Sequence, residues 1–107
     1  MSESFYSKDG RKHFQKLMEL NPDLFGSFVT FNQKVFEEGT LSVKMKELVA
    51  VACAHITRCP YCIDGHIKNA KQAGATDAEI AECVFVAIAM NAGASFAHSC
   101  ISMEALK

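Results

Sequence analysis

Apolar residues recur at spacings of three and four positions through most of the chain, which is the period of an amphipathic helix. The clearest stripe falls between positions 22 and 38 and consists of Leu24, Phe25, Phe28, Phe31, Val35 and Phe36. Valine, isoleucine and threonine do not cluster in the alternating runs that are typical of strands. The pattern therefore predicts an all-α fold, a compact bundle of five to six helices.

Capping signals place the ends of the first two helices. Residues from about 5 to 20 have weak helical spacing, and the region 1–20 is taken as a helical N-terminal extension. Asn21 followed by Pro22 is typical of a cap and the first position of a helix, which predicts a second helix over 22–38. Gly39 is expected to end that helix in a left-handed conformation.

Further helices are expected over positions 43–57, 60–73, 77–91 and 95–106, preceded in turn by Ser42, Cys59, Thr76 and Ser95. Thr76 and Glu79 have the spacing of a capping box, and Gly74 is the expected left-handed end of the preceding helix. In the helix over 43–57, the face expected to be apolar carries Met45, Leu48, Val49, Ala52, Cys53 and Ile56. A neighbouring face carries Glu47, Val51, Ala54 and His55.

The second half of the helix expected over 77–91 is apolar on every side. Such a helix is normally buried all round. A chain of 107 residues has little other structure with which to cover it. Self-association is therefore expected.

The composition limits the classes of function. A chain of this length has room for a single domain, taken here as residues 1–107. The formal net charge is −1, so there is no basic excess with which to bind nucleic acid. Charged residues interrupt the apolar stretches, so no membrane span is expected. Residues 1–11 are polar and do not resemble a secretory signal, so a cytoplasmic location is the default expectation.

The chain has five cysteines, an odd number that does not suit the disulfide scaffold of a secreted protein. Cys53, Cys83 and Cys100 lie among apolar neighbours, where a free cysteine mostly packs as a small hydrophobic residue. Cys59 and Cys62 differ, because they stand three positions apart at the polar start of a helix, within disulfide reach. In a reducing compartment such a pair indicates metal binding or redox chemistry.

His66 follows Cys62 by four positions, one turn along the same helix face. The positive start of the helix favours a thiolate, and His66 is placed to accept the thiol proton or to stabilise the thiolate as an imidazolium. Cys59, Cys62 and His66 also supply three of the four ligands that a structural zinc site needs. The fourth ligand would then come from Glu47, His55 or His98.

Three more side chains are candidates, each with an ordinary structural alternative. Glu47, twelve positions before Cys59, is either an exposed partner of neighbouring lysines or a partly buried proton acceptor. His55, four positions before Cys59, either approaches the site or packs as a satisfied histidine. Tyr61 lies between the two cysteines and either relays a proton or contributes only packing.

The order Glu47, Cys59-Pro60-Tyr61-Cys62 and His66 resembles the Glu-x11-Cys-x-x-Cys-x-x-x-His signature of AhpD-like alkylhydroperoxidases. These enzymes belong to the carboxymuconolactone decarboxylase family. Flanking residues 41–50 and 73–80 are similar as well, so the resemblance covers about residues 20–93. Glutaredoxins also use Cys-Pro-Tyr-Cys, but this chain lacks their strand pattern and has no proline after position 60.

The resemblance implies a peroxiredoxin-type oxidoreductase that assembles as trimers or hexamers. It assigns Cys62 as the peroxidatic thiol, Cys59 as the resolving thiol, and Glu47 with His66 as the proton relay. Some relatives carry a histidine between the cysteines, where this chain has Tyr61. The expected partners are a hydroperoxide substrate, an external dithiol reductant and further copies of the chain. Nothing in the sequence indicates an organic cofactor.

Three other functions remain open from the sequence. The pair at Cys59 and Cys62 also suits a thiol-disulfide oxidoreductase or redox sensor with weak peroxidase activity. It suits a zinc-stabilised interaction module, which chelation would unfold. A decarboxylase-type enzyme of the same fold is the third alternative, although such members generally lack the cysteine pair.

Overall fold

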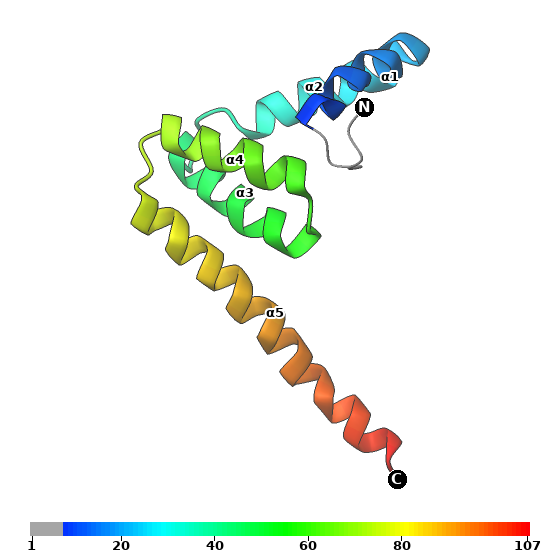
Figure 1. The fold of residues 1–107 in the computed structure, drawn as a ribbon, viewed down its shortest axis with the longest axis vertical. Helices are drawn as coiled ribbons and strands as arrows, with labels where there is room; N and C mark the ends of the chain where they lie inside the picture. Colours follow the sequence, from blue (N-terminus) through cyan, green and yellow to red (C-terminus); the bar gives the residue numbers. More distant parts are fainter. Residues whose placement is uncertain (1–7) are drawn as a thin grey trace. The chain divides into compact units, whose positions relative to one another are not determined.

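The computed structural model describes residues 8–107, which form one short 3-10 helix and five α-helices, with no strand among them. Figure 1 shows their order along the chain: η1 Lys8–His13, α1 Phe14–Leu20, α2 Pro22–Val35, α3 Val43–Thr57, α4 Pro60–Gln72 and α5 Asp77–Ala105. The all-α prediction is confirmed. The chain divides into two compact units, one ending at Val43 and one spanning Lys44–Lys107.

The first unit consists of η1, α1 and α2, and α1 packs against α2. Asn21 caps α2 as predicted, because its side chain accepts a hydrogen bond from the amide of Leu24 at 3.1 Å. The predicted end of α2 is wrong: the helix stops at Val35, and Gly39 has no left-handed backbone. Residues 5–7 of the predicted first helix lie outside the described part of the chain.

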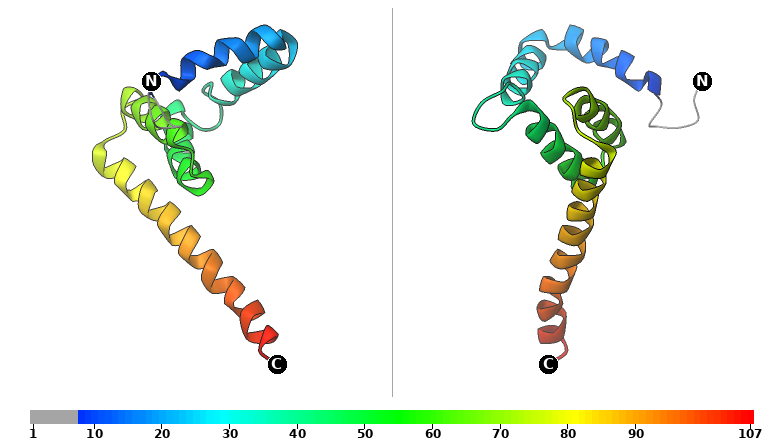
Figure 2. Two further views of the ribbon diagram at one scale, coloured as in Figure 1. Left: turned by 45° about the vertical axis from the view of Figure 1, so that its right-hand side comes forward. Right: turned by 90° about the vertical axis from the view of Figure 1, so that its left-hand side faces the viewer.

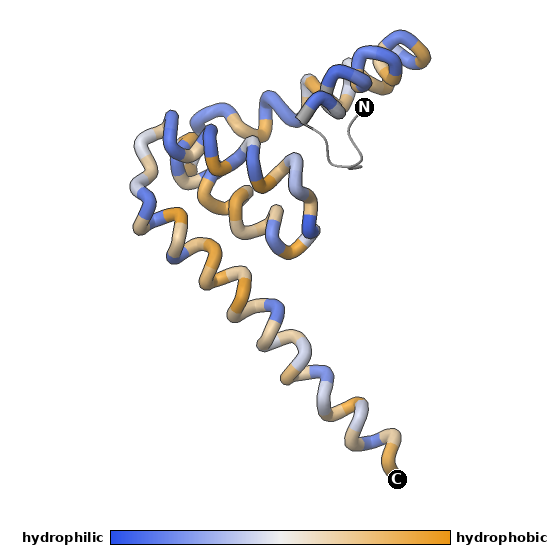
Figure 3. Tube along the Cα trace, viewed as in Figure 1, coloured by the Kyte–Doolittle hydropathy of each residue, from blue (hydrophilic) through white to orange (hydrophobic). Residues whose placement is uncertain are grey.

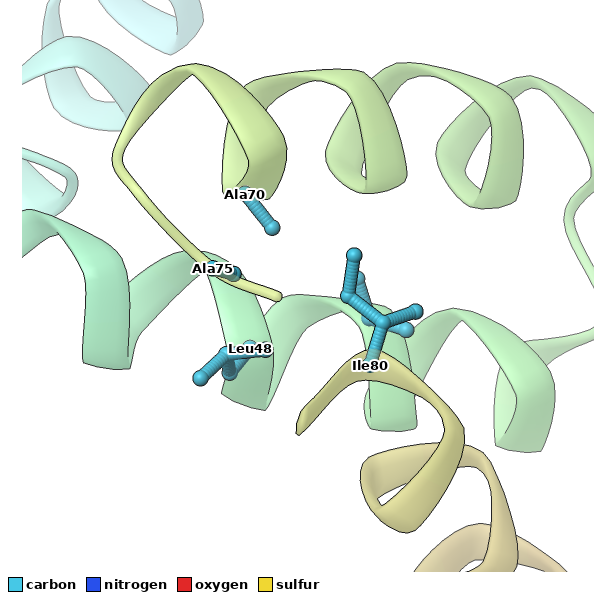
Figure 4. Close-up of a cluster of buried hydrophobic side chains, with 5 residues drawn as sticks. Leu48, Ala70, Ala75 and Ile80 are labelled. Carbon is cyan, nitrogen blue, oxygen red and sulfur yellow. The ribbon is translucent and has the colours of Figure 1, made fainter. Parts of the chain in front are cut away.

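In the second unit, α3 and α4 lie side by side and α5 leaves from the end of α4 (Figure 2). A small apolar cluster joins the three helices and consists of Leu48, Val51, Ala70, Ala75 and Ile80 (Figure 4). Val51 is the most deeply buried large side chain, with none of its surface exposed. The buried face of α3 therefore carries Glu47, Leu48, Val51 and Ala54.

This finding corrects the predicted orientation of α3. The face expected to be apolar is largely exposed, including Met45, Val49 and Ile56. Only Leu48 from that set enters the cluster. The neighbouring face is the buried one, because it is the face that meets α4 and the start of α5. The correction matters for the site, since it carries Glu47 into the interior.

The turn between α4 and α5 has the predicted chemistry. Gly74 takes a φ of 97°, the only glycine in residues 8–107 with a left-handed backbone. Thr76 and Glu79 form both bonds of the capping box. A hydrogen bond from Lys44 of α3 is the main cause that lowers the pKa of Glu79 below its ordinary value. A hydrogen bond from Lys71 likewise lowers the pKa of Asp77.

Helix α5 runs without interruption through residues 77–105, so the expected separate helix from Ser95 is wrong. No proline falls between Asn91 and Ser95, and the segment is rich in alanine. A single glycine, Gly93, costs a helix about 1 kcal/mol, which does not break it in this context. The cap conformation at Ser95 is therefore never adopted.

Most of α5 is uncovered within the chain. Only Ile80 and Ala87 are buried, whereas Phe85 is 67% and Phe96 is 81% exposed. Figure 3 shows the apolar colouring that continues along this helix. No Asp, Glu, Lys or Arg occurs from 83 to 103, so the expectation that charges interrupt every long apolar stretch is wrong here.

Among residues 8–107, α5 is the helix that is long and apolar enough to cross a membrane by length and composition. A helix that is covered by other protein meets the same criterion. The run from 83 to 103 also contains polar side chains, namely Asn91, Ser95, His98, Ser99 and Ser102. These features call for a covering surface without identifying it.

Candidate active site

The core of the site is a hydrogen bond between α3 and α4. Nδ1 of His66 lies 2.7 Å from Oε1 of Glu47. Glu47 is 4% exposed, the only buried charged residue in the described part of the chain. An ionised carboxylate only accepts, so the contact suits the tautomer of His66 that has its proton on Nδ1. In that tautomer Nε2 of His66 is the unprotonated ring nitrogen.

The fold explains why Glu47 tolerates burial. It stands on the same face of α3 as Leu48 and Val51, whose side chains enter the apolar cluster. A buried carboxylate is costly unless it is paired and hydrogen-bonded. His66 supplies that partner from the facing helix, and no buried side-chain oxygen or nitrogen among the described residues lacks a hydrogen bond. The polar pair is thus part of the packing between the two helices.

The two cysteines stand at the start of α4, as predicted, and both are partly buried free thiols. Cys59 is the N-cap, with extended backbone, and Pro60 follows at the first helical position. The sulfur of Cys59 accepts a hydrogen bond from the amide of Cys62 at 3.3 Å. His66 lies one helical turn beyond Cys62 on the same face of α4.

The turn that joins α3 to α4 is tight. The amide of Cys59 donates to the carbonyl of Ala54 at 3.2 Å, and Arg58 has a φ of 60°. Arg58 is the one non-glycine residue in residues 8–107 with a positive φ, a conformation that costs an L-residue about 1–2 kcal/mol. The positive φ of Arg58 was not predicted from the sequence. Its only signal was an arginine at the position after a helix where glycine is usual.

The remaining candidates lie as follows. Tyr61 occupies the first turn of α4, partly buried, between the two cysteines. The Nδ1 of His55 is 2.7 Å from the carbonyl of Val51 in its own helix. This contact agrees with the alternative in which His55 packs as a satisfied histidine. His98 is exposed on α5, within the unit that carries the site but on its long uncovered helix.

Of the other three cysteines, Cys83 agrees with the expectation of packing, whereas Cys53 and Cys100 differ from it. Cys83 is partly buried and packs against the apolar cluster. Cys53 and Cys100 are exposed, on α3 and α5 respectively. Their exposure has the same origin as that of their apolar neighbours, because the faces that carry them are uncovered within the chain.

The zinc alternative lacks a converging set of ligands in the described part of the chain. Within residues 8–107, no three His, Cys, Asp or Glu side chains come together in a way that could hold a metal ion. His66 directs one ring nitrogen to Glu47 rather than to the cysteines.

An open groove runs along another face of α4, which the sequence pattern did not predict. Pro60, Ile63 and Ile67 form its apolar lining, and Asp64 and Lys68 border it as an ion pair at 2.9 Å. The five positions have the spacing i, i+3, i+4, i+7 and i+8 and so share one face of the helix. Cys59, Cys62 and His66 do not line this groove.

Comparison with known proteins identifies relatives for nearly the whole described chain. The model of the carboxymuconolactone decarboxylase family matches residues 22–105. An uncharacterized protein of the cox locus of Paracoccus denitrificans is 47% identical over 73 residues, which are 68% of this chain and 66% of that protein. An uncharacterized protein of Haemophilus influenzae is 37% identical over 95 residues, 89% of this chain and 84% of that protein.

Two crystal structures have the same fold. A protein from Methanobacterium thermoautotrophicum superimposes with a TM-score of 0.75 at 34% identity, over 79% of this chain and 96% of that one. A protein from Thermotoga maritima superimposes with a TM-score of 0.71 at 26% identity, over 88% of this chain and 85% of that one. The helical architecture is thus one that occurs in experimental structures.

Proposed function

The chain belongs to the carboxymuconolactone decarboxylase family, and we propose that within this family it is a dithiol peroxidase of the alkylhydroperoxidase type. One observation carries the proposal: the buried Glu47 is hydrogen-bonded to His66, which lies one turn beyond a Cys-x-x-Cys pair at the start of α4. This arrangement supplies a nucleophile, a base and a second thiol. The family also contains decarboxylases, which do not need two thiols.

In the proposed reaction, Nε2 of His66 takes the proton of the Cys62 thiol while Glu47 holds the ring in position and stabilises the imidazolium. The Cys62 thiolate attacks the terminal oxygen of the hydroperoxide and the O–O bond breaks. The imidazolium returns its proton to the departing alkoxide, which leaves as an alcohol. Cys62 is then a sulfenic acid.

Cys59 completes the oxidative half of the cycle. Its sulfur attacks the sulfur of the Cys62 sulfenic acid, the S–O bond breaks, and the oxygen leaves as water. The product is a Cys59–Cys62 disulfide. An external dithiol restores both thiols by exchange and leaves as its own disulfide. Over one cycle, a hydroperoxide and a dithiol become an alcohol, water and a disulfide.

The test is hydroperoxide consumption by the full chain with a synthetic dithiol as the reductant. Turnover should be lost in Cys62→Ser and in Cys59→Ser. Cys53→Ser is a matched control, because it removes an exposed thiol outside the site and outside α5, and it should keep full turnover. Turnover that survives Cys62→Ser, or a wild-type chain that consumes no hydroperoxide, would refute the peroxidase.

We also propose that copies of the chain assemble through α5. The helix exposes Phe85, Val86, Ile88 and Met90, although residues of this kind are normally covered. Polar side chains spaced along the same helix favour a protein surface over lipid as the cover, since protein can satisfy their hydrogen bonds. Light scattering of the full chain should give a multiple of the mass of one chain. A monomer, or a chain that is recovered with lipid vesicles, would refute this assembly.

A further inference from the structure

The sulfur of Cys59 has a defined partner at the start of α4. The backbone amide of Cys62 donates to the sulfur of Cys59 at 3.3 Å, and that sulfur occupies the N-cap position of α4. A cap is usually an oxygen of Ser, Thr, Asp or Asn. A neutral thiol sulfur is a weak acceptor, whereas a thiolate is a strong one. The cap bond therefore favours the charged form of Cys59.

The helix adds to this preference. The positive end of the α4 dipole lies at Cys59, and cysteines at helix starts are commonly ionised near neutral pH. Pro60 at the first position has no amide hydrogen, so the Cys62 amide carries much of the capping. Cys62 stands inside the first turn, and its own amide is already used for Cys59.

The carboxylates near this end of α4 do not cancel the effect at Cys59. The adjoining turns of α3 and α4 carry the ionisable residues Glu47, His55, Arg58, Tyr61, Asp64 and His66. Both carboxylates in this set are paired, Glu47 with His66 and Asp64 with Lys68. Arg58, directly before Cys59 in the chain, adds a positive charge.

We propose that Cys59 is the leaving group when the Cys59–Cys62 disulfide is reduced, so that the reductant forms its mixed disulfide at Cys62. The inference rests on the proposed function in one respect, namely that the two cysteines form a disulfide. In an exchange reaction the sulfur that is better stabilised as a thiolate leaves faster. The same stabilisation makes Cys59 the ready nucleophile toward a sulfenic acid on Cys62.

Reduction of the Cys59–Cys62 disulfide takes place in two exchange steps. A thiolate of the dithiol attacks the sulfur of Cys62, the S–S bond breaks, and its electron pair stays on Cys59, where the Cys62 amide holds it. The second thiol of the reductant loses its proton and attacks the reductant's own sulfur in the mixed disulfide. That step releases Cys62 as a thiolate, which takes a proton from His66 or water. Two electrons pass from the dithiol to the cysteine pair.

The first experiment locates the mixed disulfide. The full chain is oxidised with one equivalent of diamide, treated briefly with excess mercaptoethanol, and quenched with acid before alkylation. Peptide mass spectrometry should find the mercaptoethanol adduct on Cys62 in preference to Cys59 by about tenfold. An adduct mainly on Cys59 would overturn the inference. Because no peroxide is used, this result does not depend on whether the chain is a peroxidase.

The second experiment measures the thiolates. Cys62→Ala keeps the backbone amide, so Cys59 in this variant should react with iodoacetamide with a midpoint about one pH unit below that of Cys62 in Cys59→Ala. Peptide-level detection excludes signals from the other cysteines. Cys62→Pro, checked for helix content, removes the amide as well, and should shift the Cys59 midpoint upward. Equal midpoints in Cys62→Ala and Cys62→Pro would contradict the role of the amide.

Discussion

Replacement of Glu47 by glutamine tests the relay most directly. The carboxylate is 4% exposed and lies 2.7 Å from the His66 ring. Glutamine has nearly the same shape and its amide oxygen still accepts a hydrogen bond, but it has no charge. What Glu47→Gln removes is therefore the electrostatic stabilisation of the imidazolium that forms when His66 takes the Cys62 proton.

The size of the effect follows from the kind of hydrogen bond that is lost. A bond to a charged group stabilises by about 1.5–3 kcal/mol, and a neutral one by about 0.5–1.5 kcal/mol. The difference of about 1–1.5 kcal/mol corresponds to about a tenfold loss of rate. Glu47→Ala also leaves the Nδ1 proton of His66 without its partner and frees the ring, so its loss should be about a hundredfold.

The assay combines hydroperoxide turnover with chemical denaturation. Glu47→Gln should keep the free energy of unfolding within about 1 kcal/mol of wild type, because no buried group is left unpaired. Glu82→Gln, at an exposed position of α5, is the control for loss of one negative charge and should leave turnover unchanged. A Glu47→Gln chain with wild-type turnover would refute the relay, as would an equal loss in both variants.

Three further outcomes test the fold around the site. Val51→Ala should lower the free energy of unfolding by about 2 kcal/mol, because it opens a cavity in the apolar cluster. Val49→Ala, on the exposed face of α3, should lower it by less than about 0.5 kcal/mol. Equal losses in denaturant titrations would contradict the orientation of α3. Arg58→Gly should raise the free energy of unfolding by about 0.5–1 kcal/mol, because the strain relieved at the positive φ exceeds the entropy that glycine adds to the unfolded chain. Thermal unfolding at an unchanged or lower midpoint would argue against strain at Arg58. The pKa of Glu79 is lowered in the folded chain, so the stabilisation that ionised Glu79 gives is present above the ordinary carboxyl pKa and disappears as the pH falls through the lowered pKa. Lys44→Gln should move the Glu79 pKa upward in an NMR titration. An unmoved pKa would show that the Lys44 contact is unimportant.

The local features of this fold were predictable because they depend on neighbouring residues. Asn21-Pro22, Gly74 and the capping box at Thr76 each act within one turn of helix, and the structure has all three. The missed helix end at Gly39 has the same origin, since a glycine permits a left-handed end without requiring one. The dithiol at the start of α4 was likewise a local pattern.

The position of Glu47 was not predictable from periodicity. The apolar residues of α3 lie on two neighbouring faces, either of which could be the buried one. Lysines lie close to Glu47 in the chain, so an exposed carboxylate was as consistent with the sequence as a buried one. What decides its burial is the contact of α3 with α4, a tertiary interaction in which His66 supplies the partner for the charge. The continuous α5 was missed for a related reason, because serine can cap a helix only if the chain is already turned there.

The proposed assembly and the proposed chemistry are linked by the size of the core. The cluster that holds α3 against α4 has five buried residues, two of which are alanines, and Glu47 depends on it for its contact with His66. Such a cluster is small for independent stability. Because association stabilises a folded chain by mass action, we expect turnover per chain to fall when dilution dissociates the assembly. The measurement is turnover against concentration, alongside light scattering. Constant turnover per chain in a sample that has become monomeric would show that each chain holds its site without help.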